Sequence, residues 1–347
     1  MQTLLWLLLP LAAASGWWMA QYSERKKTSR SLAKLNSAYG QGLNYLVNEQ
    51  ADKVSEVLVQ MLEVDPDSVE LHLALGSLFR RRGEVDRAIA IHQNIITRSK
   101  LSKALRNQAS LELGRDFLKA GLLDRAEQLL LSLLERNEYE IVVCQYLIDL
   151  YQRVKEWGKA LDIGQRLVTL DSDAWKLRLA QYHCEIGDTA LQRHDFDLAL
   201  QEAEQAWVED PNCVRATLLI GNVYQIKGDY RSAIEAYRRV EEQNPCLMPE
   251  VTGEIQSCYE RLGRRQSWED YLDGLVERHS YLVFLRKNEM EQQLQKLAAQ
   301  QLRYRCDECG FSSRRLFWQC PGCQNWGSVK PIIHERRSSD STLRDAL

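Results

Sequence analysis

Residues 76–88 read GSLFRRRGEVDRA, and the same order of glycine, aromatic, glycine and alanine returns at residues 114–126 (GRDFLKAGLLDRA) and 221–233 (GNVYQIKGDYRSA). A small residue early in such a unit lets one helix lie close against the next, and the aromatic side chain fills the gap between the two. The second glycine permits the left-handed turn that joins them. The pattern therefore predicts pairs of helices connected by tight turns.

Weaker copies extend the pattern in both directions. The position held by alanine in the clear copies falls at a spacing of 34–39 residues, at Val54, Ala88, Ala126, Ala160, Ala199, Ala233 and Trp268. A period of 34 residues with two helices per unit is that of tetratricopeptide repeats. We therefore expect an all-α fold, a solenoid of about seven repeats over residues 35–275. Such arrays present extended surfaces that hold proteins or peptides.

The composition agrees with a helical chain. Only 7 prolines and 18 glycines occur in 347 residues, fewer than strand-and-turn architectures require. The 45 basic and 48 acidic residues give a net charge of −3, which argues against a protein that binds nucleic acid through bulk positive charge.

The N-terminus carries an uncharged stretch from Leu4 to Ser23, long enough to cross a bilayer as a helix. Basic residues follow it at once, whereas none precedes it, and the positive-inside rule then places the rest of the chain in the cytoplasm. A cleaved signal peptide is the alternative, because residues 12–15 (AAAS) resemble a cleavage site. We expect an uncleaved transmembrane anchor at 1–22 and a basic linker at 23–34.

Four of the nine cysteines crowd into 18 residues near the C-terminus, as two CxxC pairs ten residues apart: Cys306, Cys309, Cys320 and Cys323. Two such pairs can supply four thiolates at tetrahedral geometry. We predict that these residues bind a metal in a rubredoxin-like or zinc-ribbon domain at 303–334, with Tyr304, Phe311, Trp318 and Trp326 forming a miniature core. Zinc and iron both accept four thiolates, so the ligands leave the metal open. A unit this small needs the metal for stability.

The metal domain also holds an excess of basic residues, namely Arg303, Arg305, Arg314, Arg315, Lys330, Arg336 and Arg337. Three interpretations stay open: binding of nucleic acid, packing on an acidic face of the repeats, and contact with anionic lipid headgroups. An iron centre would in addition allow a role in electron transfer. The segment 276–302, between the repeats and the metal domain, is predicted to be a connecting helix. Residues 335–347 are predicted to be a disordered tail.

Motifs for catalysis are missing from the sequence. It contains no phosphate-binding glycine loop with its lysine, no GxSxG elbow and no HExxH pair. The histidines of the repeats, His72, His92, His183 and His194, have no evident carboxylate partner in the sequence, and we expect packing or solvated roles for them. The five scattered cysteines read as small buried side chains. We therefore expect no enzyme.

Taken together, the leader LLLPLAAA, the repeat at 76–89 and the closing YRCxxCGF and CPxC motifs resemble one family nearly end to end, the lipopolysaccharide assembly protein B family of Gram-negative bacteria. Relative to that family, the segment 275–302 is shorter by about one repeat. The resemblance implies a single-pass protein of the inner membrane that faces the cytoplasm. It also implies that the four cysteines hold iron as in rubredoxin, with zinc as the alternative.

The resemblance further implies an adapter role. Family members help a membrane-bound AAA+ metalloprotease degrade the deacetylase that commits precursors to lipid A, and they gather other lipopolysaccharide-synthesis or transport proteins at the membrane. The expected partners are therefore these proteins and the membrane, with no nucleic acid expected.

Overall fold

The structure is a computed structural model, and it describes residues 19, 56–59, 61–62, 67–168, 172–280, 282, 285 and 303–332. The predicted anchor, basic linker and tail lie outside these residues, apart from Met19, as does most of the predicted connecting helix at 276–302. Within the described part of the chain, no helix is both long enough and apolar enough to cross a membrane.

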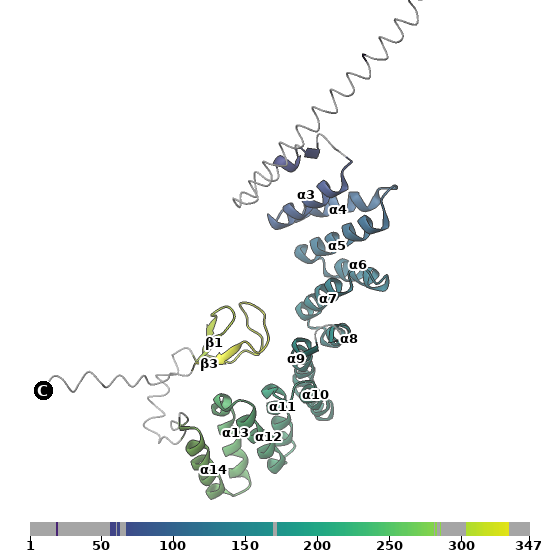
Figure 1. The fold of residues 1–347 in the computed structure, drawn as a ribbon. Coiled ribbons are helices and arrows are strands. Elements are labelled where there is room, and N and C mark those ends of the chain that lie inside the picture. The colour runs from purple at the N-terminus through teal and green to yellow at the C-terminus, as the bar shows by residue number, and fades with distance from the viewer. Residues whose placement is uncertain are drawn as a thin grey trace, which may run out of the picture. The chain divides into compact units, whose positions relative to one another are not determined.

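The described chain is mostly helical, as predicted. Helices follow one another from residue 69 to residue 278 (Figure 1). They are α3 (Val69–Arg81), α4 (Val85–Thr97), α5 (Lys103–Ala120), α6 (Leu123–Glu135), α7 (Glu140–Val154), α8 (Trp157–Val168), α9 (Ser172–Gln192), α10 (Phe196–Glu209), α11 (Val214–Ile226), α12 (Tyr230–Gln243), α13 (Met248–Arg261) and α14 (Arg265–Arg278). A 3-10 turn, η1 (Pro245–Leu247), precedes α13.

The chain divides into two compact units, residues 1–150 and 151–347. The first unit contains α3 to α6 and most of α7, and the second contains the end of α7, the remaining helices and a small sheet. Each unit has its own buried apolar clusters.

The repeat pattern predicts the packing of each helix pair. The alanines of the pattern in α4, α6, α8, α10 and α12 are fully buried, and Trp268 of α14 is 8% exposed. The first glycine lies where its helix touches the next one. A Cβ placed on Gly76 would come within 2.5 Å of His92, and one on Gly114 within 3.1 Å of Leu130. These close approaches explain why the positions are small.

The turns between paired helices confirm the second glycine of the pattern. Gly83, Gly121, Gly228 and Gly263 all adopt positive φ angles, between 66° and 84°. In the part of the chain that the structure describes, two repeats lack this glycine and have Lys155 and His194 instead, each with φ of 60°. This conformation has a free-energy cost for any residue that carries a side chain. The turn geometry is therefore kept even where the sequence departs from the pattern.

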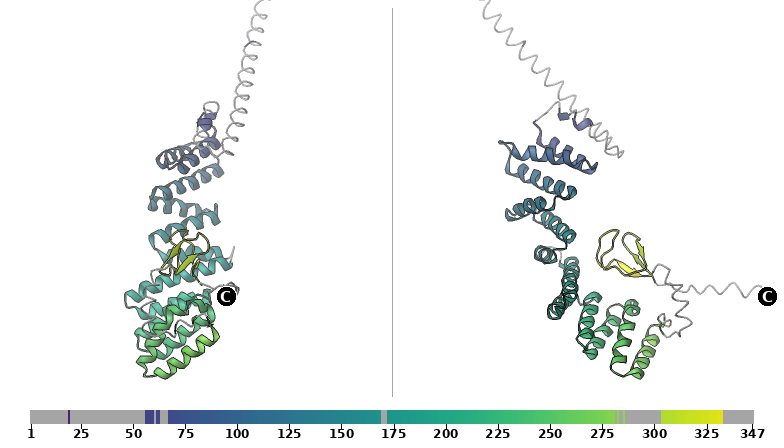
Figure 2. Two further views of the ribbon diagram at one scale, coloured as in Figure 1. Left: turned by 90° about the vertical axis from the view of Figure 1, so that its left-hand side faces the viewer. Right: turned by 180° about the vertical axis from the view of Figure 1, so that it is seen from behind.

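The second unit ends in a three-stranded antiparallel sheet, drawn in yellow in Figure 2. Strand β1 (Tyr304–Cys306) lies between β2 (Ser312–Ser313) and β3 (Val329–Pro331). In β1, Tyr304 and Cys306 are buried and Arg305 is exposed. The side chains buried below the sheet are Tyr304, Cys306, Cys320 and Val329, and Phe311, Leu316 and Cys323 pack against them. We refer to residues 303–332 as the ribbon.

Candidate metal centre

The four cysteines of the ribbon meet at one point. Their sulfur atoms all lie within 4.8 Å of one another. The Sγ atoms of Cys306 and Cys323 are 3.7 Å apart, and those of Cys309 and Cys320 are 3.6 Å apart. A metal bound tetrahedrally at about 2.3 Å from each sulfur requires sulfurs about 3.8 Å apart. The spacing therefore fits a single tetrahedral ion.

The two CxxC turns share one backbone design. The N–H of Cys306 donates to the carbonyl of Phe311, and the N–H of Cys320 donates to that of Asn325, in both cases five residues on. Gly310 and Gln324 then occupy the left-handed region, with φ of 74° and 59°. Two short, equivalent turns thus bring both pairs of thiols to the same point.

Backbone N–H groups donate hydrogen bonds to the sulfurs of Cys306 and Cys309, which favours the thiolate form that binds a metal cation. The pKa of Cys306 is lowered to about 6, first by the Ser328 hydroxyl at 3.3 Å and then by the N–H groups of Cys309 and Glu308. The Phe311 N–H also lowers the pKa of Cys309, but burial and the neighbouring thiols outweigh it and raise that pKa to about 12. Crowded thiols resist ionising together, and a bound cation removes this conflict.

The second CxxC turn passes close to the sulfurs at Gly322, where a side chain would be crowded. A Cβ on Gly322, inside the second CxxC, would lie 3.1 Å from Cys309 Sγ and 3.8 Å from Cys320 Sγ. Sulfur donors, their spacing and their amide hydrogen bonds together fit a tetrathiolate metal such as iron or zinc. When bound, the metal would supply the cross-link that the small core of the ribbon lacks.

The ribbon docks on the repeats of its own unit through Trp326, three residues after Cys323. Its indole Nε1 donates to Gln152 Oε1 at 3.0 Å. The ring meets Trp157 and Tyr182 edge to face, with centroids 6.0 Å away in each case. The guanidinium of Arg215 lies 5.9 Å from the ring centre. Helices α7, α8, α9 and α11 thus each contribute one side chain to a seat for Trp326.

Two further groups of contacts, one apolar and one polar, hold the ribbon against the repeats. Leu316 and Trp318 pack against the apolar cluster of α11 to α14. Glu250 at the start of α13 accepts a hydrogen bond from the Tyr304 hydroxyl and one from Arg303, the latter at 3.1 Å. Burial and the bond to Glu250 raise the pKa of Tyr304, so the phenol remains a donor.

These contacts correct part of the sequence prediction. Tyr304 and Phe311 do form the core of the ribbon, but Trp318 and Trp326 pack on the repeats instead. Among the basic residues that the structure describes in the ribbon, Arg303 is the one that pairs with an acidic group of the repeats, which fits packing on the repeats for this residue.

The histidines also depart from expectation, because two of them have carboxylate partners. His92, fully buried, has Nδ1 2.5 Å from Asp116 Oδ2, and His183 has Nδ1 2.7 Å from Glu202 Oε2. These contacts join neighbouring helices, so they support packing. The scattered cysteines are buried as predicted, except that Cys246 is partly exposed.

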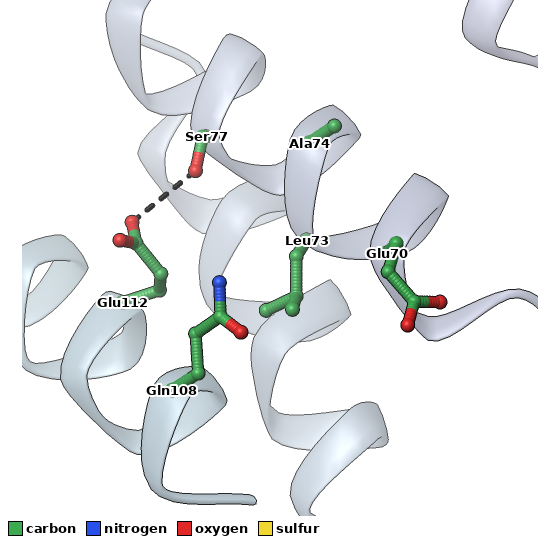
Figure 3. A pocket seen from close by; sticks show the side chains of 6 residues that line it. All are labelled: Glu70, Leu73, Ala74, Ser77, Gln108 and Glu112. Carbon is green, nitrogen blue, oxygen red and sulfur yellow. Dashed lines mark hydrogen bonds between the residues drawn. The ribbon is translucent and has the colours of Figure 1, made fainter. Parts of the chain in front are cut away.

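The first unit has a pocket of about 260 Å³ between α3 and α5 (Figure 3). It is lined by Glu70, Leu73, Ala74, Ser77, Gln108 and Glu112. Behind it, Arg80 binds Glu112 at 2.5 Å and Asp116 at 2.7 Å. Glu112 also accepts from Ser77. The guanidinium of Arg80 thus links Glu112 and Asp116, and this wall of the pocket is a network of polar side chains.

Comparison with known proteins supports both the metal site and the repeats. Residues 304–331 match the family model described as rubredoxin metal binding domain, and residues 71–104 and 184–245 match tetratricopeptide repeat models. Lipopolysaccharide assembly protein B of Escherichia coli K12 is 34% identical over 383 residues, covering 96% of this chain and 98% of that protein. This chain belongs to the lipopolysaccharide assembly protein B family. The Haemophilus influenzae member is 31% identical over 394 residues, covering 96% and 99%.

Solved structures resemble the repeats more distantly. YrrB, described as a tetratricopeptide-repeat protein with an unusual peptide-binding site, is 16% identical, with a TM-score of 0.36 over 55% of this chain and 94% of YrrB. Pseudomonas aeruginosa PilF is 18% identical, with a TM-score of 0.35 over 65% of this chain and 99% of PilF.

Proposed function

We propose that this protein is an inner-membrane adapter that keeps lipopolysaccharide synthesis in check. In this proposal it presents the lipid A-pathway deacetylase to the membrane AAA+ metalloprotease and gathers other lipopolysaccharide-synthesis or transport proteins. Membership of the assembly protein B family over nearly the full chain carries the proposal. Tetratricopeptide repeats suit it, because stacked helix pairs offer long surfaces for proteins.

The membrane anchor belongs to the same proposal. Residues 1–22 would hold the chain in the inner membrane as a single span, with residues 23–34 as the cytoplasmic linker. Confinement to the membrane raises the effective concentration of an adapter toward membrane-bound partners. The repeats at 35–275 would supply the contact surface, and residues 303–334 the metal domain.

The metal is proposed to be iron, held by Cys306, Cys309, Cys320 and Cys323, with zinc as the alternative. Metal analysis of anaerobically purified protein decides between them, because it identifies the element directly; after oxidation a ferric tetrathiolate is in addition coloured, whereas a zinc tetrathiolate is not. Zinc alone would also exclude an electron-transfer role. With either metal, the docking of the ribbon supports a structural role for the ion, because Trp326, which contacts the repeats, lies three residues after the second CxxC pair.

Deleting residues 1–22 tests the adapter function. The truncated protein should fold and remain soluble but no longer lower the level of the deacetylase in cells. A strain in which deacetylase turnover stays normal with the truncated protein would contradict the proposal. Immunoblotting after protein synthesis is stopped measures this turnover, and the full-length chain at equal expression is the control.

A further inference from the structure

The sheet of the ribbon has an outer face that the repeats do not cover. Arg305 points outward from β1, between the buried Tyr304 and Cys306. It pairs in register with the partly buried Ser312 on β2 and with the exposed Lys330 on β3, so these three side chains share one face. A Cβ on Gly310 would lie 3.8 Å from Arg305 Nη2, which places the guanidinium beside the first CxxC turn, next to Phe311.

The segment after β2 adds an aromatic group and two more arginines. Leu316 and Trp318 pack against the repeats, and the residue between them, Phe317, is 38% exposed. Its ring meets Phe311 edge to face at 6.1 Å. Arg314 and Arg315 are exposed just before it. Phe317 thus packs on Phe311 of the ribbon and leaves part of its ring exposed.

The charged side chains of the ribbon differ in whether they have an ion-pair partner. Arg303 is taken up by Glu250, and Lys330 pairs with Asp307 at 2.5 Å. Arg305, Arg314 and Arg315, in contrast, form no ion pair with any residue that the structure describes. Within 303–332, Glu308 is the carboxylate left without an ion pair. Three cations and one anion therefore remain for an external partner.

We propose that Arg305, Arg314, Arg315 and Phe317 form a docking surface for an acidic segment of a protein partner that also carries an apolar side chain. Guanidinium groups match carboxylates with two parallel hydrogen bonds. Arginine beside an exposed aromatic ring is the composition that dominates binding energy at protein interfaces. The proposal goes beyond the adapter function, because it holds whichever protein is delivered.

A protein segment fits this surface better than a continuous polyanion does. The unpaired Glu308 lies two residues after Cys306 on the same ribbon and would repel the extended phosphates of a nucleic acid or an anionic bilayer. A short acidic segment brings fewer negative charges near Glu308 than a continuous polyanion does. An apolar side chain in it would cover Phe317.

Binding to the full-length, metal-loaded chain in detergent tests the proposal. The probe is a fluorescent twelve-residue peptide that alternates pairs of glutamates with phenylalanine or leucine. Matched probes are the same peptide with glutamine for glutamate, a single-stranded RNA of twelve nucleotides, and vesicles with one third phosphatidylglycerol. The variants are Arg305→Glu/Arg315→Glu and Phe317→Ser. Arg193→Glu/Arg264→Glu, on exposed sites of the repeats, is the control of equal charge.

We expect the acidic peptide to bind, and the double charge reversal to weaken it about tenfold or more at low salt. Phe317→Ser should weaken it several-fold, the control variant should bind as the parent does, and the glutamine peptide should not bind. Equal binding by all variants, no binding at all, or stronger binding of RNA or vesicles that the same reversal abolishes would overturn the proposal. Metal content is measured throughout, and Arg314→Glu replaces any variant that loses metal.

Discussion

The indole N–H of Trp326 donates to the side-chain carbonyl of Gln152 across 174 positions of sequence, at 3.0 Å. Gln319 donates to the same oxygen at 3.3 Å. Both donors flank the second CxxC turn, since Gln319 precedes Cys320 and Trp326 follows Cys323. The geometry of that turn and the docking of the ribbon on the repeats are therefore coupled, and by linkage each should strengthen the other.

Loss of the Trp326 ring should loosen the metal. Trp326→Ala removes two edge-to-face aromatic contacts, each contributing about 0.5–1.5 kcal/mol. We expect metal transfer to a coloured chelator to become about tenfold faster, since about 1.4 kcal/mol of lost coupling corresponds to that factor. Trp207→Ala, which removes an indole that packs under Arg239 of the repeats, is the control. Equal release rates for the two variants would show that docking does not support the site.

The hydrogen bond between Gln152 and Trp326 can be measured by a double-mutant cycle. Trp326→Phe keeps an aromatic ring but removes the donor, and Gln152→Ala removes the acceptor. We expect a coupling free energy of about 0.5–1.5 kcal/mol in urea unfolding of the second unit. Additive effects would contradict a direct bond. The cycle is needed because Gln152→Ala alone also frees Gln319.

Close helix contacts should make the pattern glycines sensitive to a single methyl group. A Cβ on Gly221 would clash with the ring of Tyr237, so Gly221→Ala should lower the free energy of unfolding by about 1–3 kcal/mol. Gly253, inside α13, has no atom within 4 Å of such a Cβ. Gly253→Ala should therefore raise it by about 0.5–1 kcal/mol. Equal effects at both sites would mean that the helices pack more loosely than the structure shows.

Acid should weaken the first unit through Glu112. Burial raises the pKa of this carboxyl, but the charge of Arg80 and its hydrogen bond outweigh burial, and the pKa lies below its usual value of 4.5. Because the folded pKa is below the unfolded one, the stability from this group is fully present above about pH 4.5 and is lost as pH falls through the folded pKa. Glu112→Gln should flatten the acid limb of the thermal midpoint against pH. Glu269→Gln, at an exposed pair, should leave the limb unchanged.

Replacing one thiol should destroy the ribbon. Cys306→Ser or Cys320→Ser leaves three thiolates, which rarely hold a structural metal, and we expect loss of metal, of the ribbon fold and of the proposed deacetylase regulation. Cys246→Ala changes a partly exposed cysteine outside the cluster and should preserve all three. Regulation that persists in a metal-free Cys306→Ser protein would contradict a role for the metal.

Local features of the fold were predictable from the sequence, whereas the long-range contacts were not. The alanine and glycine positions reveal the helix pairs because tight packing allows few residue types there, and Ala88 and Gly83 lie as expected. The two CxxC pairs likewise place four sulfurs together. From its place beside the second CxxC pair, Trp326 is predicted to lie in the core of the ribbon. Its contact with Gln152 has no counterpart in the sequence, because no periodicity relates the two residues. The pair of His92 and Asp116 joins two repeats and leaves no sequence motif.

Hydrogen exchange of the full-length chain, with metal and after its removal, tests most directly whether the metal holds the ribbon on the repeats. We predict that removing the metal abolishes protection of the amides from Gln319 to Gly327 and also reduces protection in α9 around Tyr182, while α4 in the first unit is unchanged. Unchanged protection in α9 after the ribbon has lost its own would contradict the account, because the ribbon and its seat would then be independent.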